Sequence, residues 1–168
     1  RGGVVKRVLI VGSGGIGRRH LKGHGLTGRA ELAIVEPDAG RRAEAAQMFG
    51  IKEAYTDIRE ADLSRFDLAV ICAPANYHVA LIRTCAAARL PFMVEKPLSV
   101  TMDDVDVALA EVRDSGIEAR VGYVRRVAEE VVALREKIRG GKIGKLRLAY
   151  LNSSQEFPKY RPDFHRTY

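Results

Sequence analysis

A glycine-rich turn between an apolar run and an amphipathic segment constrains the fold of this chain more than any other feature. Val4 to Val11 is nearly continuous in β-branched and apolar residues, which is typical of a strand covered on both faces in a parallel sheet. The run ends in Gly12-Ser13-Gly14-Gly15-Ile16-Gly17, and Gly15 to Leu26 then mixes charged and apolar residues as a surface helix does. The sequence therefore predicts a strand, a tight turn and a helix, in that order.

The turn has the form G-x-G-x-x-G, which in this context is the dinucleotide-binding fingerprint. Gly12 permits the tight turn, Gly14 lets the backbone approach a pyrophosphate, and Gly17 allows the helix to pack closely on the strand. The helix N-terminus then faces the anion. The alternative is an ordinary glycine-rich turn between a strand and a helix. We expect the whole segment to bind cofactor, namely Gly12, Ser13, Gly14, Gly15, Ile16 and Gly17.

An acidic residue follows the second predicted strand, Glu31 to Val35, at the offset that the fingerprint requires. Glu36 lies 19 positions after Gly17, and we expect it to accept hydrogen bonds from an adenosine ribose. A carboxylate there repels a 2′-phosphate, which favours NAD. NADP stays possible because Arg41 and Arg42 are close in sequence, although solvated positions early in a helix explain those two arginines as well.

Strand and helix patterns continue to alternate, which predicts an α/β fold of the Rossmann type with a doubly wound parallel sheet. Asp38 is expected to cap a helix that stops at Gly50. After Gly144 large apolar residues alternate with Arg147 and Ala149, which predicts the first strand of a second, α+β domain. Gln155 to Tyr168 has no clear periodicity. We assign residues 1–123 to a nucleotide-binding domain and 124–168 to the opening of an incomplete substrate domain. The further strands expected are Ala54–Thr56, Leu68–Ala73, Phe92–Glu95, Glu118–Tyr123 and Leu146–Leu151, and the further helices are Tyr77–Ala88, one from Thr101 or Asp103 to Ser115, and Val127–Ile138.

Composition excludes several classes of protein. The hydrophobic fraction is 46% and no run is long enough to span a membrane, so we expect a cytoplasmic protein without a membrane partner. The net charge of +7 comes from residues 119–168, where the basic residues lack the interleaved aromatics of a nucleic-acid site, so no nucleic-acid partner is expected. Cys72 and Cys85 have apolar neighbours and no companion pair, which favours buried free thiols and no metal site.

Two further segments leave predicted strands at the carboxyl edge of the sheet, where open α/β sheets bind their ligands. Glu95-Lys96-Pro97 places a lysine there that can donate a hydrogen bond to a substrate oxygen, whereas the same lysine alone would be an ordinary surface residue. The second segment contains Ala73, Pro74, Asn76 and His78. We expect Asn76 to cap the next helix, and His78 either to be structural or to face cofactor or solvent.

These motifs together resemble the Gfo/Idh/MocA oxidoreductases, the family of glucose-fructose oxidoreductase and inositol 2-dehydrogenase. The resemblance covers essentially the whole chain. It rests on the fingerprint followed by His20, on Glu36, Pro74-x-Asn76-x-His78, Glu95-Lys96-Pro97, Gly122-Tyr123 with Arg125-Arg126, and Gly141-Lys142-Ile143-Gly144.

The resemblance implies a two-domain enzyme that binds NAD or NADP, with Lys96 as a catalytic residue beside the nicotinamide and a sugar, cyclitol or nucleotide sugar as substrate. The cofactor contacts it implies include Ala73, Pro74, Asn76, His78 and Glu95, and it implies a cis bond between Lys96 and Pro97. The family's second domain supplies an aspartate and a histidine that this chain lacks, since His165 does not match that motif. We therefore expect a truncated chain, and a homo-oligomer.

Two alternatives of other classes remain at this point. A non-catalytic module that senses or sequesters NAD would also keep the fingerprint and lack the acid/base residues. A nucleic-acid-binding protein would use the basic tail, and its affinity would fall steeply with salt. Turnover with excess cofactor separates the enzyme from the module.

Overall fold

A computed structural model gives the fold of residues 4–152 together with 154, 156 and 159. The strands are β1 (Lys6–Val11), β2 (Ala30–Val35), β3 (Glu53–Tyr55), β4 (Leu68–Ile71), β5 (Phe92–Val94) and β6 (Ala119–Val121). The helices are α1 (Gly15–Leu26), α2 (Ala39–Phe49), α3 (His78–Ala87), α4 (Val105–Ser115) and α5 (Glu129–Arg139). Short 3₁₀ turns are η1 (Ile58–Glu60), η2 (Leu63–Arg65), η3 (Ala75–Tyr77) and η4 (Val124–Arg126).

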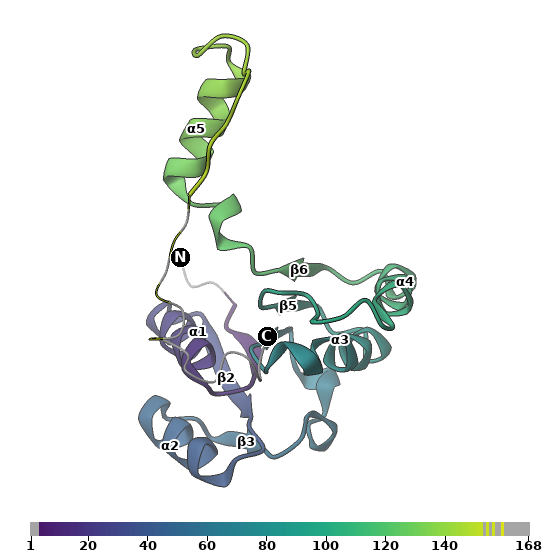
Figure 1. Ribbon diagram of the computed structural model, residues 1–168. Helices are drawn as coiled ribbons and strands as arrows, with labels where there is room; N and C mark the ends of the chain where they lie inside the picture. The colour runs from purple at the N-terminus through teal and green to yellow at the C-terminus, as the bar shows by residue number, and fades with distance from the viewer. Residues whose placement is uncertain (1–3, 153, 155, 157–158, 160–168) are drawn as a thin grey trace. The chain divides into compact units, whose positions relative to one another are not determined.

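The six strands form one parallel sheet in the order β3-β2-β1-β4-β5-β6 (Figure 1). Val11 at the end of β1 is paired with Val35 on one side and with Ile71 on the other. The strand order reverses at β1, and in such sheets the ligand crevice lies outside the carboxyl ends of the strands at that reversal. The predicted Rossmann-type sheet is confirmed.

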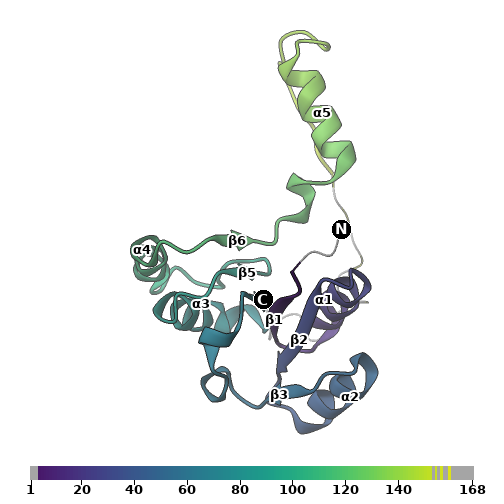
Figure 2. The same cartoon turned by 180° about the vertical axis from the view of Figure 1, so that it is seen from behind.

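Both faces of this sheet are covered by helices, which explains why the central strands are apolar at successive positions. Leu9 and Val11 belong to the core beneath α3 and α4, whereas Val8 and Ile10 belong to the core beneath α1 and α2. Figures 1 and 2 show the two pairs of helices on opposite sides of the strands. Leu21, which is fully buried, anchors α1 to the sheet.

The ends of α2 agree with the signals in the sequence. The Asp38 carboxylate accepts a hydrogen bond from the backbone N–H of Arg41 at 2.7 Å, and Gly50 closes the helix in the left-handed conformation with φ 65°. Both features satisfy backbone groups that a helix leaves unpaired at its ends. They place Glu36, at the end of β2, immediately before a fixed helix.

The start of α4 differs from the prediction. The helix begins at Val105 rather than at Thr101 or Asp103, and Asp104 before it has a φ of 56° and no side-chain capping bond. The Ser99 and Thr101 hydroxyls instead accept hydrogen bonds from backbone N–H groups two residues later. Such local bonds compete with the helix and keep the chain in turns up to Asp104.

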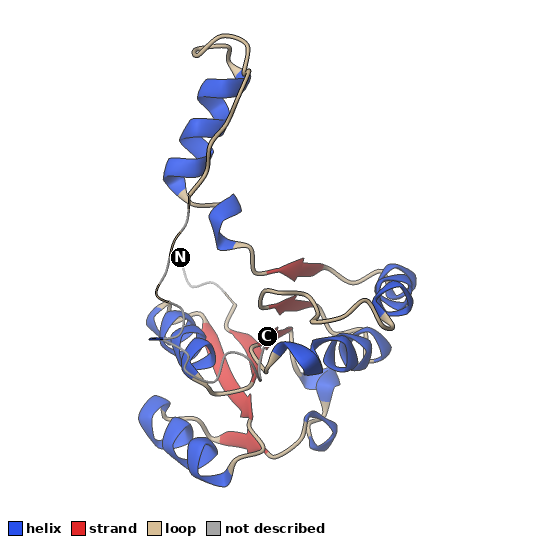
Figure 3. Ribbon diagram, in the orientation of Figure 1, coloured by secondary structure: helices blue, strands red, loops and turns tan. Residues whose placement is uncertain are grey.

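The predicted strand Leu146–Leu151 is also wrong. Residues 145–152 are an irregular segment, drawn as loop in Figure 3, in which Leu148, Tyr150 and Leu151 are at least 85% exposed. A strand requires a partner for its backbone groups, and in residues 123–152 none is present. Alternating sequence alone therefore did not produce a strand here.

The chain divides into two compact units at Gly122 and Tyr123. The first contains the sheet and α1–α4, and the second contains η4 and α5. Among the helices that the structure describes, none is long and apolar enough to cross a membrane. The predicted irregular segment from Gln155 onward, including His165, lies outside the described residues except for positions 156 and 159.

Candidate functional site

The fingerprint turn lies at the carboxyl end of β1, where two of its glycines are required by close contacts. Gly12 has a φ of 96°, and a Cβ there would lie 2.8 Å from the backbone N of Ala73. A Cβ on Gly17 would lie 1.9 Å from the carbonyl oxygen of Gly12. A Cβ on Gly14 or Gly15 would have no atom of the described residues within 4 Å, so the turn is open on that side.

Ser13 and Glu36 join the ends of β1 and β2. The backbone N–H and the hydroxyl of Ser13, which is fully buried, donate to Glu36 Oε2 at 3.0 and 3.1 Å. Glu36 Oε1 accepts from the backbone N–H of Asp38 at 3.1 Å and from Arg41 Nη2 at 2.8 Å. Burial opposes ionisation most, but the hydrogen bonds from Arg41, Ser13 and Asp38 outweigh it and lower the pKa of Glu36 to about 2. The carboxylate is therefore ionised at neutral pH.

The two arginines after Asp38 are not simply solvated. Arg41 is half-exposed and pairs with the Glu36 carboxylate, and Arg42 Nη1 donates to the Glu36 carbonyl oxygen at 2.6 Å. Arg18 of α1 donates through Nε to the Ser13 carbonyl and forms a bidentate pair with Glu44 of α2 at 2.7 and 2.6 Å. Sequence reasoning noted Arg41 and Arg42 but missed these bonds, although their spacing from Glu36 fits the first turn of a helix.

Lys96 follows β5 at the same carboxyl edge of the sheet and is exposed. The bond between Lys96 and Pro97 is cis, as predicted. Glu95 beside it is 8% exposed, and its Oε1 lies 2.9 Å from Nε2 of His20 in α1. His20 was part of the motif string, but nothing in the sequence paired it with Glu95, 75 positions away.

The segment after β4 contains a buried histidine. His78 is 1% exposed, with Nδ1 2.8 Å from the Pro97 carbonyl oxygen and Nε2 2.9 Å from the Ala73 carbonyl oxygen. This is the structural arrangement considered above, and the ring does not face solvent. Asn76 is not a helix cap, because η3 runs directly into α3 and no side chain caps either turn.

Both cysteines are buried and free, as predicted. Burial, with a contribution from the Glu95 charge at Cys72, raises the pKa of each thiol to about 12. A thiol that stays protonated is a poor nucleophile. Neither cysteine is therefore a candidate for covalent chemistry.

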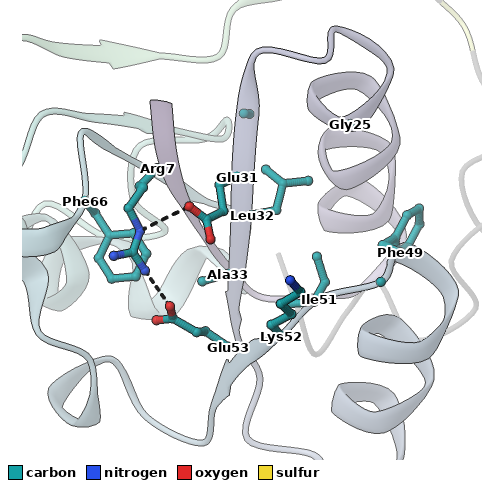
Figure 4. A pocket seen from close by; sticks show the side chains of 12 residues that line it. Arg7, Gly25, Glu31, Leu32, Ala33, Phe49, Ile51, Lys52, Glu53 and Phe66 are labelled. Carbon is teal, nitrogen blue, oxygen red and sulfur yellow. Dashed lines mark hydrogen bonds and ion pairs between the residues drawn. The ribbon is translucent and has the colours of Figure 1, made fainter. Parts of the chain in front are cut away.

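A cavity of about 250 Å³ lies at the other, amino edge of the sheet (Figure 4). Arg7 of β1 crosses it, forms ion pairs with Glu31 and Glu53, and lies 5.2 Å from the centre of the Phe66 ring. Because the strands are parallel, this edge is opposite the fingerprint turn. The cavity is therefore separate from the fingerprint turn.

The carboxyl edge thus brings together an open glycine turn, an ionised carboxylate and an exposed lysine. Residues 6–123 match the oxidoreductase family with an NAD-binding Rossmann fold. The chain belongs to this family, the Gfo/Idh/MocA oxidoreductases. The match spans the sheet, the fingerprint and Glu95-Lys96-Pro97, so the family's nucleotide-binding domain is present from β1 to Tyr123.

Individual members of the Gfo/Idh/MocA family resemble the chain over most of its length. The myo-inositol 2-dehydrogenase of Thermotoga maritima is 29% identical over 154 residues, which cover 90% of this chain and 46% of that protein. An inositol 2-dehydrogenase of Leifsonia xyli is 34% identical over 83% of this chain and 42% of that protein. The chain spans less than half the length of these relatives.

Solved structures of Gfo/Idh/MocA dehydrogenases share the fold. The scyllo-inositol dehydrogenase from Lactobacillus casei, solved with bound NAD(H) and scyllo-inositol, superposes with a TM-score of 0.77 at 21% identity. The superposition covers 84% of this chain and 43% of the chain in that structure. The glycine turn and the ionised carboxylate at the β2 end fit the cofactor that the family binds.

Proposed function

We propose that the chain forms the cofactor-binding half of an oxidoreductase that moves a hydride between NAD and a hydroxyl or keto carbon of a sugar, cyclitol or nucleotide sugar. The observation that carries the proposal is the common position of the fingerprint turn, Glu36 and Lys96 at the carboxyl ends of β1, β2 and β5. The inositol dehydrogenases among its relatives support the substrate class.

Each part of this edge has a proposed task. The turn from Gly12 to Gly17 and the start of α1 would hold the pyrophosphate, and Glu36 would accept from the adenosine ribose. All of the acceptor positions of Glu36 have donors in this structure, so a ribose hydroxyl would replace a side-chain donor such as Arg41 or the Ser13 hydroxyl. Ala73, Pro74, Asn76 and Glu95 would line the remainder of the cofactor site, and the buried His78 would support this lining from behind, next to the Ala73 and Pro97 carbonyls.

The nicotinamide, when bound, supplies the hydride chemistry. Lys96 would donate a hydrogen bond to the substrate oxygen and stabilise the charge that develops there. Residues 124–168 would open the substrate domain, in which other side chains take or give the hydroxyl proton. We also propose a homo-oligomeric assembly and a cytoplasmic location. The two buried cysteines form no disulfide, which agrees with a reducing compartment such as the cytoplasm.

The isolated chain is expected to bind NAD(H) and to oxidise no polyol. Phosphate and ribose contacts come from one preformed α/β unit, whereas turnover requires a substrate held against the cofactor and a group for the hydroxyl proton. Titration calorimetry with NAD(H), followed by an absorbance assay with a panel of inositols and sugars, tests both halves. Absence of NAD binding would contradict the proposal, and robust turnover by a sequence-verified monomer would contradict the division of tasks.

NAD(H) is expected to bind more tightly than NADP(H), and Arg41→Ala to widen that difference by about tenfold. Arg41 offsets the Glu36 charge and can turn to a 2′-phosphate, so its removal leaves the carboxylate to repel that phosphate. Calorimetry with both cofactors measures the ratio. Arg83→Ala, which breaks an exposed pair with Glu111 between α3 and α4, is the matched control and should leave the ratio unchanged. Equal affinities in the wild type would refute the preference.

A further inference from the structure

A buried histidine holds the backbone on the C-terminal side of Lys96. His78 begins α3, and its two ring nitrogens lie 2.8 and 2.9 Å from the carbonyl oxygens of Pro97 and Ala73. A carbonyl oxygen only accepts, so a ring nitrogen binds one only when it carries a proton: a neutral ring donates to one of the two carbonyls, and an imidazolium donates to both. The ring thereby ties the residue after Lys96 to the segment that leaves β4.

A second histidine holds the N-terminal side of Lys96. Glu95 Oε1 lies 2.9 Å from His20 Nε2, and Glu95 Oε2 accepts weakly from the backbone N–H of Lys96 at 3.3 Å. The same carboxylate packs against the end of β6, where a Cβ on Gly122 would lie 3.4 Å from Oε1. The Glu95 side chain therefore lies between His20 of α1 on one side and Gly122, the residue after β6, on the other.

The two contacts flank Lys96, whose side chain has four rotatable bonds and starts from the backbone that these contacts restrain. A displacement of about 1 Å of a reacting group can cost about 100-fold in rate. Side chains that hold such a group at both neighbouring residues reduce that displacement. The contacts also come from helices that pack on opposite faces of the sheet, so they restrain the segment from two directions.

We propose that His20 and His78 are positioning residues for Lys96, acting through the Glu95 side chain and the Pro97 carbonyl. The proposal rests on the proposed role of Lys96 and adds the residues that orient it. Neither histidine needs to touch substrate for this role. His20 also belongs to the helix that begins at the fingerprint turn, so the same pair links the cofactor-binding helix to the lysine segment.

The test compares His20→Phe, which removes the donor to Glu95, with His20→Gln, which keeps a donor of similar reach. In a full-length enzyme containing this chain, His20→Phe is expected to lower kcat at least about tenfold while KM and the Kd of NAD change less than about twofold. His20→Gln should recover most of the loss. His78→Phe should act in the same direction, and its thermal unfolding is measured alongside because the ring is buried.

A spectroscopic readout makes the test independent of turnover. After reductive ¹³C-methylation of the isolated chain, the dimethyl-lysine resonance assigned through Lys96→Arg should shift or broaden in His20→Phe and return in His20→Gln. His24→Phe is the control. The His24 ring stacks on His20 with 6.1 Å between ring centres, and among the described residues it has no hydrogen bond to Glu95. The His24→Phe variant should leave the resonance and kcat as in the wild type.

The outcomes separate this inference from the proposed function. If wild-type protein binds NAD and depends on Lys96, but His20→Phe keeps the wild-type kcat and resonance, the positioning role is overturned. If Lys96→Ala itself leaves kcat unchanged, the role proposed for the lysine is wrong. Should His78→Phe fail to fold, the comparison of the two His20 variants still decides the matter.

Discussion

Gly17→Ala is expected to weaken NAD binding by at least about 100-fold, or about 2.8 kcal/mol. The added Cβ would lie 1.9 Å from the Gly12 carbonyl oxygen and 2.9 Å from its carbonyl carbon, both backbone atoms that cannot rotate away. Either α1 moves away from β1 or the fingerprint turn opens. Overpacking of this kind also lowers the free energy of unfolding by roughly 1–3 kcal/mol. Calorimetry and thermal unfolding of the isolated chain measure the two effects.

Two glycines in the same region serve as controls. At Gly23, in the same helix, the added Cβ would have no atom within 4 Å among the residues with described positions, so Gly23→Ala should keep NAD affinity and stabilise the helix by about 1 kcal/mol. A Cβ on Gly14 would likewise have no described atom within 4 Å. Gly14→Ala should therefore lower NAD affinity without lowering the unfolding temperature, because the added methyl group would meet only the pyrophosphate. A Gly17→Ala protein with normal NAD affinity would show that the turn does not bind the cofactor.

Replacing Lys96 with alanine in a full-length enzyme is expected to lower kcat by about 100- to 1,000-fold, which is the usual cost of removing one donor to a developing oxyanion. The Kd of NAD should change far less, because pyrophosphate and ribose contacts come from the turn and from Glu36. Steady-state kinetics together with NAD titration separate the two quantities.

Lys52→Ala is the matched control for Lys96→Ala. Lys52 is exposed and immediately precedes β3, at the amino edge of the sheet, so its removal should leave both kcat and NAD affinity unchanged. Lys96→Arg keeps the charge but changes the shape of the donor, and it should recover only part of kcat. A near-normal kcat in Lys96→Ala would rule out its role at the substrate oxygen.

Much of the first unit could be predicted because its signals are local. The apolar run of β1, the fingerprint and the helix from Gly15 to Leu26 appear in the structure with little change, as do the cap at Asp38 and the stop at Gly50. Continuous apolar strands that alternate with helices leave few arrangements besides a doubly wound parallel sheet. The position of Glu36 and Lys96 at one sheet edge then follows from the direction of the strands.

Local signals failed where the outcome depends on neighbours. The start of α4 was displaced by turns that Ser99 and Thr101 support, and Asn76 lost its capping position because η3 continues into α3. The alternating residues of Leu146–Leu151 do not form a strand, since pairing needs a second backbone and not only a pattern.

The sequence by itself determined the fold family, the fingerprint turn and which residues reach the carboxyl edge of the sheet, because these depend on periodicity and short-range backbone geometry. Only the tertiary structure decided the pairs made there: His20 with Glu95, His78 with the Pro97 carbonyl, and Arg41 with Glu36. Two of these pairs join residues that are far apart along the chain, and all three depend on side-chain directions that packing selects. Distance along the chain carries no information about such contacts, whereas the folded sheet brings their atoms within hydrogen-bonding reach.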